Sequence, residues 1–393
     1  MAVLGMRTTA NLATDERPKA WRLGIMDEYP DANPLCNLIY RVGKEKVSDP
    51  EFNWFERRFP TKELTTATAP NSGAASDSGT AGSLVVGTGE AYNCKKGSVI
   101  LNTATDELVL VTADTTDGIT LSITRGLGET AGETWGATDK LQVIGNANPE
   151  GADIGSAITW DPAKKYGYCQ IIRNVADTTR TLGKTLLRTG DKRKDAQKQA
   201  LLDHETDKER SLLWSKLSEN LTTTPGPTRT MAGLYDSITT NITDFGTTGV
   251  TMSNWLAALA APMANGSDEK MLLCGSTALM TLSEMARVNS MQIVDVAKQD
   301  AYGMNLRRWI TEFGTVIIKE HKLLSKSTKH KSWAFLVDPD DFVYRYVDDT
   351  EWLPGRQGNG ADRFTGEYLA EVGFEIHNEY DHAVFKNMLS YVG

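Results

Sequence analysis

The sequence predicts a mixed α+β fold built from more than one domain. Three observations predict it. Short alternating segments separated by glycine-rich turns follow one another before residue 150, a long charged segment without proline comes next, and helical and strand patterns then alternate toward the C-terminus. The length of 393 residues and the hydrophobic content of 40% are sufficient for two or three separate cores.

Composition and charge exclude several classes of protein. The formal net charge of -9 disfavours a nucleic-acid-binding chain, because phosphate binding is driven by clustered Lys and Arg. The four cysteines form no CxxC pair, so we expect small core residues in a reducing compartment. The N-terminus lacks the apolar region of a signal peptide, and the longest nearly apolar run, Trp255 to Ala264, is too short to span a bilayer. We therefore expect assembly in the cytoplasm without a membrane.

The first 50 residues contain four prolines and show no sustained helical or strand period. Such a segment cannot bury a face of its own. We expect an extended arm that becomes ordered on another surface, such as a neighbouring subunit, and the alternative is a partly disordered chain end. Its isolated apolar anchors are Trp21, Leu35, Ile39 and Tyr40.

A small all-β module is predicted at about residues 70–150. The aromatic and charged stretch FNWFERRFP, residues 52–60, precedes TTATAPNSGAASDSGTAGS, whose Ser, Thr, Ala and Gly content is typical of a linker. Asp117-Gly118 is a strong hairpin signal, and a second glycine-rich linker closes the module near residue 156. The strand candidates are Leu84–Val86, Ser98–Leu101, Glu107–Val111, Ile119–Ile123 and Leu141–Ile144.

A glycine turn in this module, Arg125-Gly-Leu-Gly, resembles part of a dinucleotide-binding fingerprint. That fingerprint requires a helix directly after the glycines, so that the helix N-terminus faces the pyrophosphate. The residues that follow, ETAGETWGATDK, are interrupted by Gly132 and Gly136, and no helix can begin there. We therefore expect Gly126 and Gly128 to supply positive φ angles at a strand corner.

A long helix is predicted over Asp191–Glu219, which contains no proline or glycine and interleaves both charge signs with a sparse apolar stripe. At about 1.5 Å per residue it would be on the order of 40 Å long, a spine rather than a bundle member, and TTTPGP is expected to end it. From about residue 226 the pattern predicts one compact α+β domain. The tail RFTGEYLAEVGFEIHNEYDHAVFKNM predicts two long strands that pair around residues 378–381.

Residues with catalytic or ligand-binding potential are few. Gly275-Ser276-Thr277 follows a strand and precedes a helix but lacks the lysine of a phosphate loop, so we expect an N-cap there. The two histidines of HNEYDH would face opposite sides of a strand, which disfavours a shared metal. The acidic clusters at 338–341 and 348–349 allow a general acid and base, although Asp is commoner in turns. We expect no enzyme, no cofactor and no metal.

The order of these parts carries a resemblance that spans nearly the whole chain from about residue 50. An arm, a loop with an inserted β module containing TRGLGET, a charged helix, an α+β domain and long terminal strands follow one another. Four stretches occur in this order along the chain: ITRGLGETAGETWGATDKLQVIG, FGTVIIKEHKLL, AFLVDPDDFVYRYVDDTEWLP and EYLAEVGFEIHNEYDHAVF. This series resembles tailed-bacteriophage major capsid proteins of the Hong Kong 97-type fold, and more narrowly siphophage head proteins.

The resemblance implies hexamers and pentamers that form an icosahedral head around double-stranded DNA, without sequence-specific DNA binding. The implied partners are further copies of the chain, a portal protein and, where they are used, scaffolding or decoration proteins. The implied location is the virion, after assembly in the cytoplasm of a host bacterium. The implied domains are an N-arm at 1–50, an extended loop at 51–165, a peripheral domain at 166–225 with the spine helix at 191–219, an axial domain at 226–360, and terminal strands at 361–393 that return to the peripheral domain.

Aromatic and charged residues outside the expected cores are the candidates for contacts between subunits: Trp21, Trp54, Phe55, Glu56, Arg57, Arg58, Phe59 and Arg125. Local packing beneath the β module is the alternative for the aromatic stretch. Two other functions stay open. The Thr- and Gly-rich β segment is compatible with a carbohydrate-binding or adhesive surface protein, and the carboxylates between Asp338 and Asp349 are compatible with a hydrolase.

Overall fold

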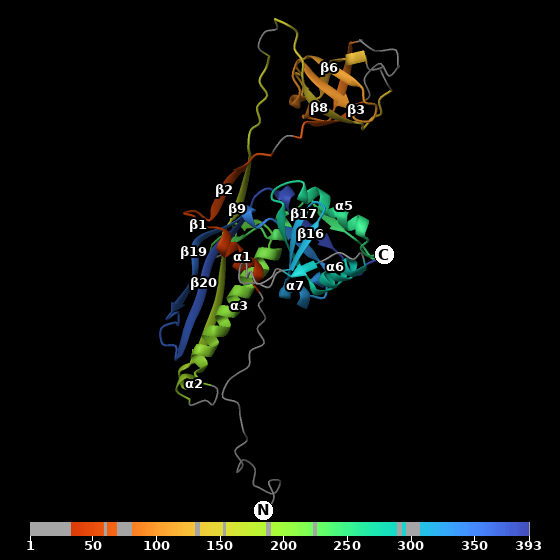
Figure 1. Cartoon of the computed structure of the whole chain (residues 1–393). Helices are drawn as coiled ribbons and strands as arrows, with labels where there is room; N and C mark the ends of the chain where they lie inside the picture. The colour runs from red at the N-terminus through yellow and green to blue at the C-terminus, as the bar shows by residue number, and fades with distance from the viewer. Residues whose placement is uncertain are drawn as a thin grey trace, which may run out of the picture. The chain divides into compact units, whose positions relative to one another are not determined.

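The computed structural model describes residues 33–58, 61–68, 81–129, 134–151, 155–185, 190–222, 226–288, 293–295 and 307–392. The chain forms two compact units (Figure 1). Unit 1 consists of Met1–Trp54 and Lys164–Gly393, and unit 2 of Phe55–Ala163. Within the described residues, no helix combines the length and apolar character needed to cross a membrane.

Unit 2 is a closed β-barrel with the strand order β3-β4-β7-β6-β5-β8. Alternating apolar side chains fill its interior, including Leu64, Ile100 and Ile123. The two ends of the stretch expected to be a linker belong to this barrel, because Thr65–Thr68 ends one strand and Ala81–Ser83 begins the next, and residues 69–80 lie outside the described residues. β-branched threonines at alternating positions suit a half-buried strand. The strands are β3 (Glu63–Thr68), β4 (Ala81–Val86), β5 (Ser98–Asn102), β6 (Leu108–Ala113), β7 (Thr120–Thr124) and β8 (Lys140–Asn146).

The glycine turn after β7 has the backbone that its sequence predicts. Gly126 and Gly128 have φ angles of 68° and 72°. Among the described residues, only a 3-10 turn, η3 (Leu127–Glu129), follows the glycines, and residues 130–133 lie outside this part of the chain.

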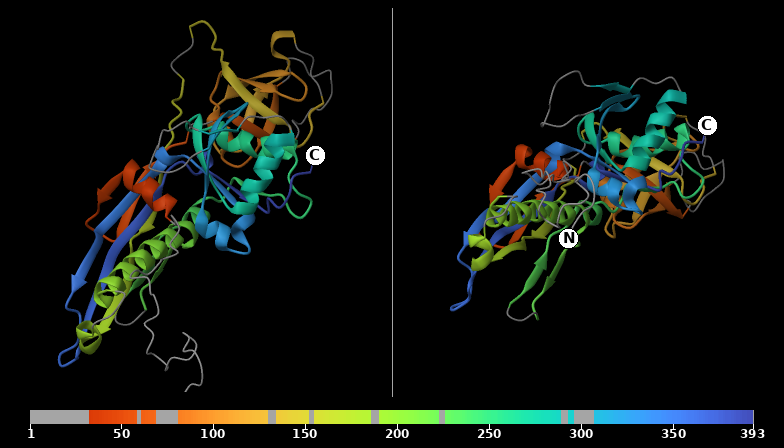
Figure 2. Two further views of the ribbon diagram at one scale, coloured as in Figure 1. Left: turned by 60° about the horizontal axis from the view of Figure 1, so that its bottom comes forward. Right: turned by 90° about the horizontal axis from the view of Figure 1, so that it is seen from below.

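Unit 1 contains a four-stranded sheet with the order β1-β19-β20-β10, and helix α3 (Lys192–Trp214) runs along it (Figures 1 and 2). The side chain of Asp191 caps the helix by accepting from the backbone N of Arg193 at 2.9 Å. The strands are β1 (Lys44–Lys46), β10 (Gln170–Thr179), β19 (Phe342–Pro354) and β20 (Arg363–Ile376), and α2 (Arg180–Lys184) follows β10.

The predicted end of the spine helix at Glu219 is wrong, because α3 ends at Trp214. Residues Ser218–Asn220 form strand β11, which pairs with β12 (Thr228–Thr230). Gly233 also donates from its backbone N to the Ser215 carbonyl at 2.8 Å. Pairing with a segment ten residues further on therefore overrides the local helical pattern.

The second sheet of unit 1 has seven strands in the order β13-β21-β18-β14-β17-β16-β15. Helix α5 packs against it through Trp255, whose ring stacks on Trp309 at a centroid distance of 6.1 Å. The strands are β13 (Ile242–Asp244), β14 (Glu269–Cys274), β15 (Ile293–Asp295), β16 (Arg307–Thr311), β17 (Gly314–Glu320), β18 (Ala334–Val337) and β21 (Ala383–Lys386). The helices are α4 (Leu234–Ser237), α5 (Met252–Met263), α6 (Ser276–Val288) and α7 (Lys322–Lys326), with the 3-10 turn η5 (His330–Ser332).

The two terminal strands do not pair with each other as expected. β20 pairs with β19 and β10, whereas β21 lies between β13 and β18 in the other sheet. Asn378, at a positive φ of 48°, turns the chain between them. The continuous apolar run of β21 suits a strand buried on both faces, which only the seven-stranded sheet offers it.

Residues 34–42 form helix α1 (Pro34–Val42), although no helix was expected in the first 50 residues. Pro34 occupies the first turn, where its missing N–H costs nothing. Leu35, Leu38 and Ile39 lie at helical spacing and are fully buried. A short sheet of β2 (Glu51–Glu56) and β9 (Ala163–Tyr168) follows, and all four cysteines are buried free thiols.

Candidate assembly surfaces and a buried polar joint

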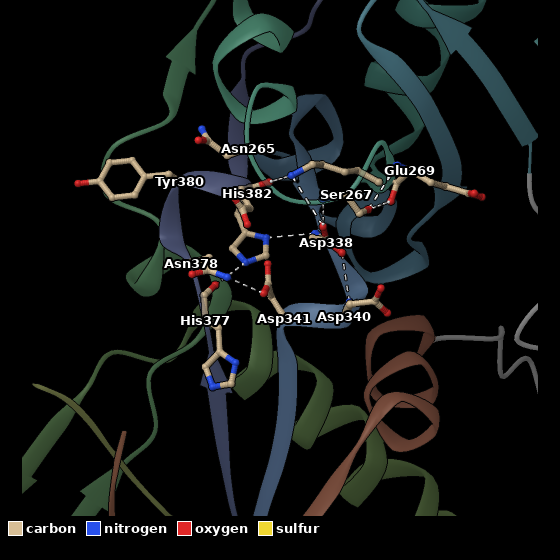
Figure 3. Close-up of polar contacts among 12 residues, drawn as sticks. Asn265, Ser267, Glu269, Asp338, Asp340, Asp341, His377, Asn378, Tyr380 and His382 are labelled. Carbon is tan, nitrogen blue, oxygen red and sulfur yellow. Dashed lines mark hydrogen bonds and ion pairs between the residues drawn. The ribbon is translucent and has the colours of Figure 1, made fainter. Parts of the chain in front are cut away.

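Two of the connections between the sheets of unit 1 pass the same place. β18 leads through η6 (Pro339–Asp341) into β19, and β20 leads through η7 (Glu379–Asp381) into β21. Polar side chains from both connections meet there (Figure 3). We call this cluster the polar joint, and its members are Lys270, Asp338, Asp341, Asn378, Asp381 and His382.

Lys270 of β14 supplies the cation of the polar joint, and its side chain is fully buried. Its Nζ donates to the Asp381 carbonyl oxygen at 2.8 Å and lies 3.9 Å from Oδ2 of Asp338. Burial lowers the pKa of Lys270, and the nearby carboxylates oppose this effect. Asp338 also accepts from the backbone N of Ser267 at 2.9 Å, so it links three separate segments.

Asp341 and Asp381 form a carboxyl pair in the same cluster. Burial raises the pKa of Asp341 to about 7, with further contributions from the negative charges of Asp338 and Asp381, while a hydrogen bond from Asn378 Nδ2 at 2.9 Å opposes the rise. Burial also raises the pKa of Asp381. The carboxyl pair therefore retains a proton to higher pH than isolated aspartates do.

His382 is held as a neutral ring. Its Nδ1 accepts from the backbone N of Asp338 at 3.1 Å, and its Nε2 donates to the His377 carbonyl at 3.1 Å. Burial lowers its pKa to about 4. Both ring nitrogens are therefore occupied by protein partners, and the described residues contain no group of three ligand-type side chains that could hold a metal ion.

A second buried cluster attaches helix α1 to helix α3. Glu209 accepts from the backbone N of Leu35 at 2.8 Å and of Cys36 at 2.7 Å, so its two oxygens cap the start of α1. Nε2 of His321 also contacts Glu209, at 2.8 Å. Beside it, Lys208 donates to Tyr40 Oη at 2.7 Å. The sequence analysis named Leu35 and Tyr40 as apolar anchors but missed Glu209, Lys208 and His321. The four-residue spacing of His204, Lys208 and Leu212 could have indicated a buried face of the helix.

The aromatic stretch of β2 is divided between two faces. Phe52 is buried against the backbone of Gly167 and Gly373, where an added Cβ would lie 2.6 Å and 2.5 Å from its ring. Trp54 stacks on Phe52 at 5.9 Å, so local packing accounts for the inner face. Phe55 lies on the outer face and is 69% exposed.

The remaining candidates of this stretch differ in exposure. Arg57 and Arg58 are exposed, whereas Glu56 is partly buried. Trp21 and Phe59 lie outside the described residues. Contacts between subunits through any of these positions stay a prediction.

Arg125 lies inside the barrel and not on its surface. Its side chain and that of Glu107 are both fully buried, with Nε to Oε1 at 2.9 Å and Nη2 to Oε2 at 2.6 Å. The Trp135 Nε1 donates to the same carboxylate at 2.7 Å. Burial therefore removes the reason for naming the Arg125 side chain as a contact between subunits.

The acidic clusters considered for hydrolysis make structural contacts. Asp338 belongs to the polar joint, and Asp349 pairs with Lys44 at 2.9 Å and accepts from the backbone N of Thr350 at 2.8 Å. These carboxylates connect strands and connections within unit 1.

Comparison with solved structures shows the fold. The capsid of a native GTA particle matches with a TM-score of 0.50 over 96% of this chain and 97% of that chain, at 7% identity. A Mycobacterium phage Bobi chain gives a TM-score of 0.44 over 96% of each chain, also at 7% identity. The match to the GTA capsid shows that the chain has the Hong Kong 97-type capsid fold.

Comparison of sequences shows the family to which the chain belongs. The model of the SU10 major capsid protein matches residues 8–389, and the chain belongs to this family. The major capsid protein of Pseudomonas phage PaMx41 is 23% identical over 277 residues, which are 68% of this chain and 65% of that protein. The chain thus spans somewhat less than two thirds of that relative. The family match favours a capsid protein over the carbohydrate-binding alternative.

Proposed function

We propose that the chain is the repeating subunit of a phage head, assembling as hexamers and pentamers into an icosahedral shell around double-stranded DNA. The observation that carries this proposal is the match of one major capsid protein family to residues 8–389, on a chain with the capsid fold. The role needs no catalytic residue. Assembly takes place in the host cytoplasm, and the head receives a portal and any scaffolding or decoration proteins.

The proposed domain roles follow the two sheets and the barrel. Residues 1–50 act as an arm, residues 51–165 as an extended loop, and residues 226–360 as the axial domain that surrounds the symmetry axes. Residues 166–225 and 361–393 supply the peripheral domain. The Glu209 cap supports a fixed attachment of the arm, because it holds the start of α1, within residues 1–50, on the spine helix.

Electron microscopy of the purified chain tests the proposal. We expect capsomers, shells or tubes whose subunits refine to hexameric and pentameric rings. Light scattering measures the size of the assembled species over a range of salt and crowding conditions. A chain that stays monomeric in every condition contradicts the proposal.

A further inference from the structure

A lysine-rich segment stands out from the acidic chain. Residues 319–333 contain five lysines and one glutamate, whereas the whole chain carries a net charge of -9. The segment runs from the end of β17 through α7 and η5. Lys326, Lys329 and Lys331 are exposed, and no described carboxylate forms an ion pair with them. Their charge is therefore available to a partner.

The segment borders a groove of about 590 Å³. The groove is lined by the last turn of α3 and by α7, and combines cationic side chains with hydroxyl groups. The Trp214 ring forms part of its wall. Its lining residues are Arg210, Ser211, Trp214, Ser215, Leu323, Lys326, Ser327 and His330.

The groove is held in shape by buried contacts. His321, at the start of α7, contacts Glu209 of α3 at 2.8 Å, with both side chains fully buried. Trp214 of α3 stacks on His330 of η5 at a centroid distance of 4.1 Å. The cations therefore project from a fixed frame, which lowers the ordering cost of binding.

The charge balance favours an anion. Arg210 is partly neutralised by Asp207 at 3.0 Å, and burial lowers the pKa of His330, which disfavours a positive charge on this ring. The C-terminal end of α3 contributes about half a negative charge. Lys326 lines the groove, and the adjoining segment adds two exposed positive charges on Lys329 and Lys331, so cationic side chains outnumber carboxylates along residues 319–333.

We propose that this basic groove contacts the phosphate backbone of the double-stranded DNA that the head encloses. Lys, Arg and Ser are typical phosphate-binding side chains, whereas Lys is depleted in interfaces between proteins. The groove therefore fits DNA better than an acidic protein segment. The contact is independent of base sequence and rests on the proposed function. The negative net charge of the whole chain does not exclude this contact, because the lysines are concentrated in one segment.

A salt titration with matched variants tests this inference. The probe is a 30-base-pair duplex of mixed sequence, and its affinity for the full chain is measured by fluorescence anisotropy at several sodium chloride concentrations. The triple variant Lys326→Gln, Lys329→Gln, Lys331→Gln is expected to bind roughly tenfold more weakly at low salt. Its slope of log K against log salt falls by about 0.9 for each phosphate contact that is lost.

The control removes the same charge elsewhere in unit 1. Lys46→Gln, Lys164→Gln, Lys165→Gln changes three exposed lysines of β1 and β9 and is expected to bind within about twofold of the unchanged chain. Equal losses in both variants, or no binding by the unchanged chain, overturn the inference. Binding of polyglutamate in place of DNA overturns it in favour of an acidic protein partner.

Shell formation separates this inference from the proposed function. A groove variant that forms shells but loses DNA affinity supports the inference. Shells from the unchanged chain without any DNA affinity overturn the inference and leave the capsid function in place. Circular dichroism checks that the triple variant is folded. If it is not, the single variant Lys329→Gln replaces it, and its slope of log K against log salt is expected to fall by about 0.9.

Discussion

Glu107 and Arg125 form a bidentate ion pair inside the barrel of unit 2, and both side chains are fully buried. Glu107→Gln leaves the guanidinium without its charge partner, and we expect a loss of about 3–5 kcal/mol in barrel stability. Hydrogen exchange of the barrel amides in the full chain measures this loss without assuming that the two units unfold together.

Two further variants test whether the loss of stability comes from the buried ion pair. Asp106→Asn changes the neighbouring exposed carboxylate and is expected to alter stability by less than about 0.5 kcal/mol. Glu107→Leu combined with Arg125→Met removes both charges and is expected to recover most of the loss. An equal loss in the Asp106 variant would show that net charge, and not the buried pair, is responsible.

Glu209 links the start of α1 to α3, so its removal should release α1 locally. Glu209→Ala leaves the buried N–H groups of Leu35 and Cys36 without an acceptor, at about 1–3 kcal/mol for each group. We expect faster hydrogen exchange across α1 and faster tryptic cleavage after Arg41. Asp203→Ala on the exposed face of the same helix is the control, and comparable exchange in the two variants contradicts the capping role.

The carboxyl pair of the polar joint should make stability depend on pH. The pKa of Asp341 is about 7 in the folded chain and about 3.8 when unfolded. The folded state therefore binds more protons between these values, and this contribution is fully present below pH 3.8 and lost as pH rises through 7. Asp341→Asn keeps a donor toward Asp381 and should stabilise the chain more at pH 8 than at pH 5, measured by urea denaturation.

His382 has the opposite dependence and must be separated from this effect. Its pKa is lowered to about 4, so its contribution is present above its ordinary value of 6.5 and lost as pH falls through 4. The other charged groups that face this site are Lys270, Asp338 and Asp381. None of them is substituted in the two variants that are compared. The difference between Asp341→Asn and the exposed control Asp340→Asn isolates Asp341, and parallel curves for the two variants contradict the prediction.

Phe55 is the exposed aromatic of β2 and the strongest of the predicted contacts between subunits. Phe55→Ser removes an apolar anchor from the surface, and we expect a several-fold lower yield of shells with an unchanged melting temperature. Asn53→Ser, on the same exposed strand face, should assemble normally. The ratio of shells to smaller species by sedimentation measures the effect, and equal yields remove Phe55 from the interface.

Local patterns in the sequence predicted individual elements better than their ends and partners. β5 occupies Ser98–Asn102, close to the predicted Ser98–Leu101, because a short run rich in β-branched residues and bounded by turn residues favours a strand. Helix α1 was missed since its apolar spacing covers only nine residues. The end of α3 was placed too late because the competing partner, β12, lies beyond a turn.

The polar clusters depend on partners that are distant in the sequence. Glu209 meets Leu35 across 174 residues, and Lys270 meets Asp381 across 111. A single sequence contains no signal that joins such positions. Arg125 illustrates the same limit, because a charged residue beside a glycine turn is usually exposed, and only Glu107 makes its burial favourable.

The limits of unit 2 give the last prediction, on the role of the barrel in assembly. A deletion of residues 70–150 would remove β4 to β8 and leave β3 unpaired, so the deletion should instead follow the unit boundary. β2 ends at Glu56 and its partner β9 begins at Ala163. Replacing residues 57–162 by a short Asn-Gly turn should therefore leave unit 1 folded, with its tryptophan fluorescence and melting temperature retained.

Shell formation by this deletion variant decides what the barrel contributes. We expect fewer or malformed shells, because the barrel presents a separate folded surface, and a folded unit 1 excludes general misfolding as the cause. Replacing the same residues with an unrelated flexible linker of equal length controls for spacing, and it should fail in the same way. Intact shells from either variant would show that unit 2 is not required for assembly and would restrict the contacts between subunits to unit 1.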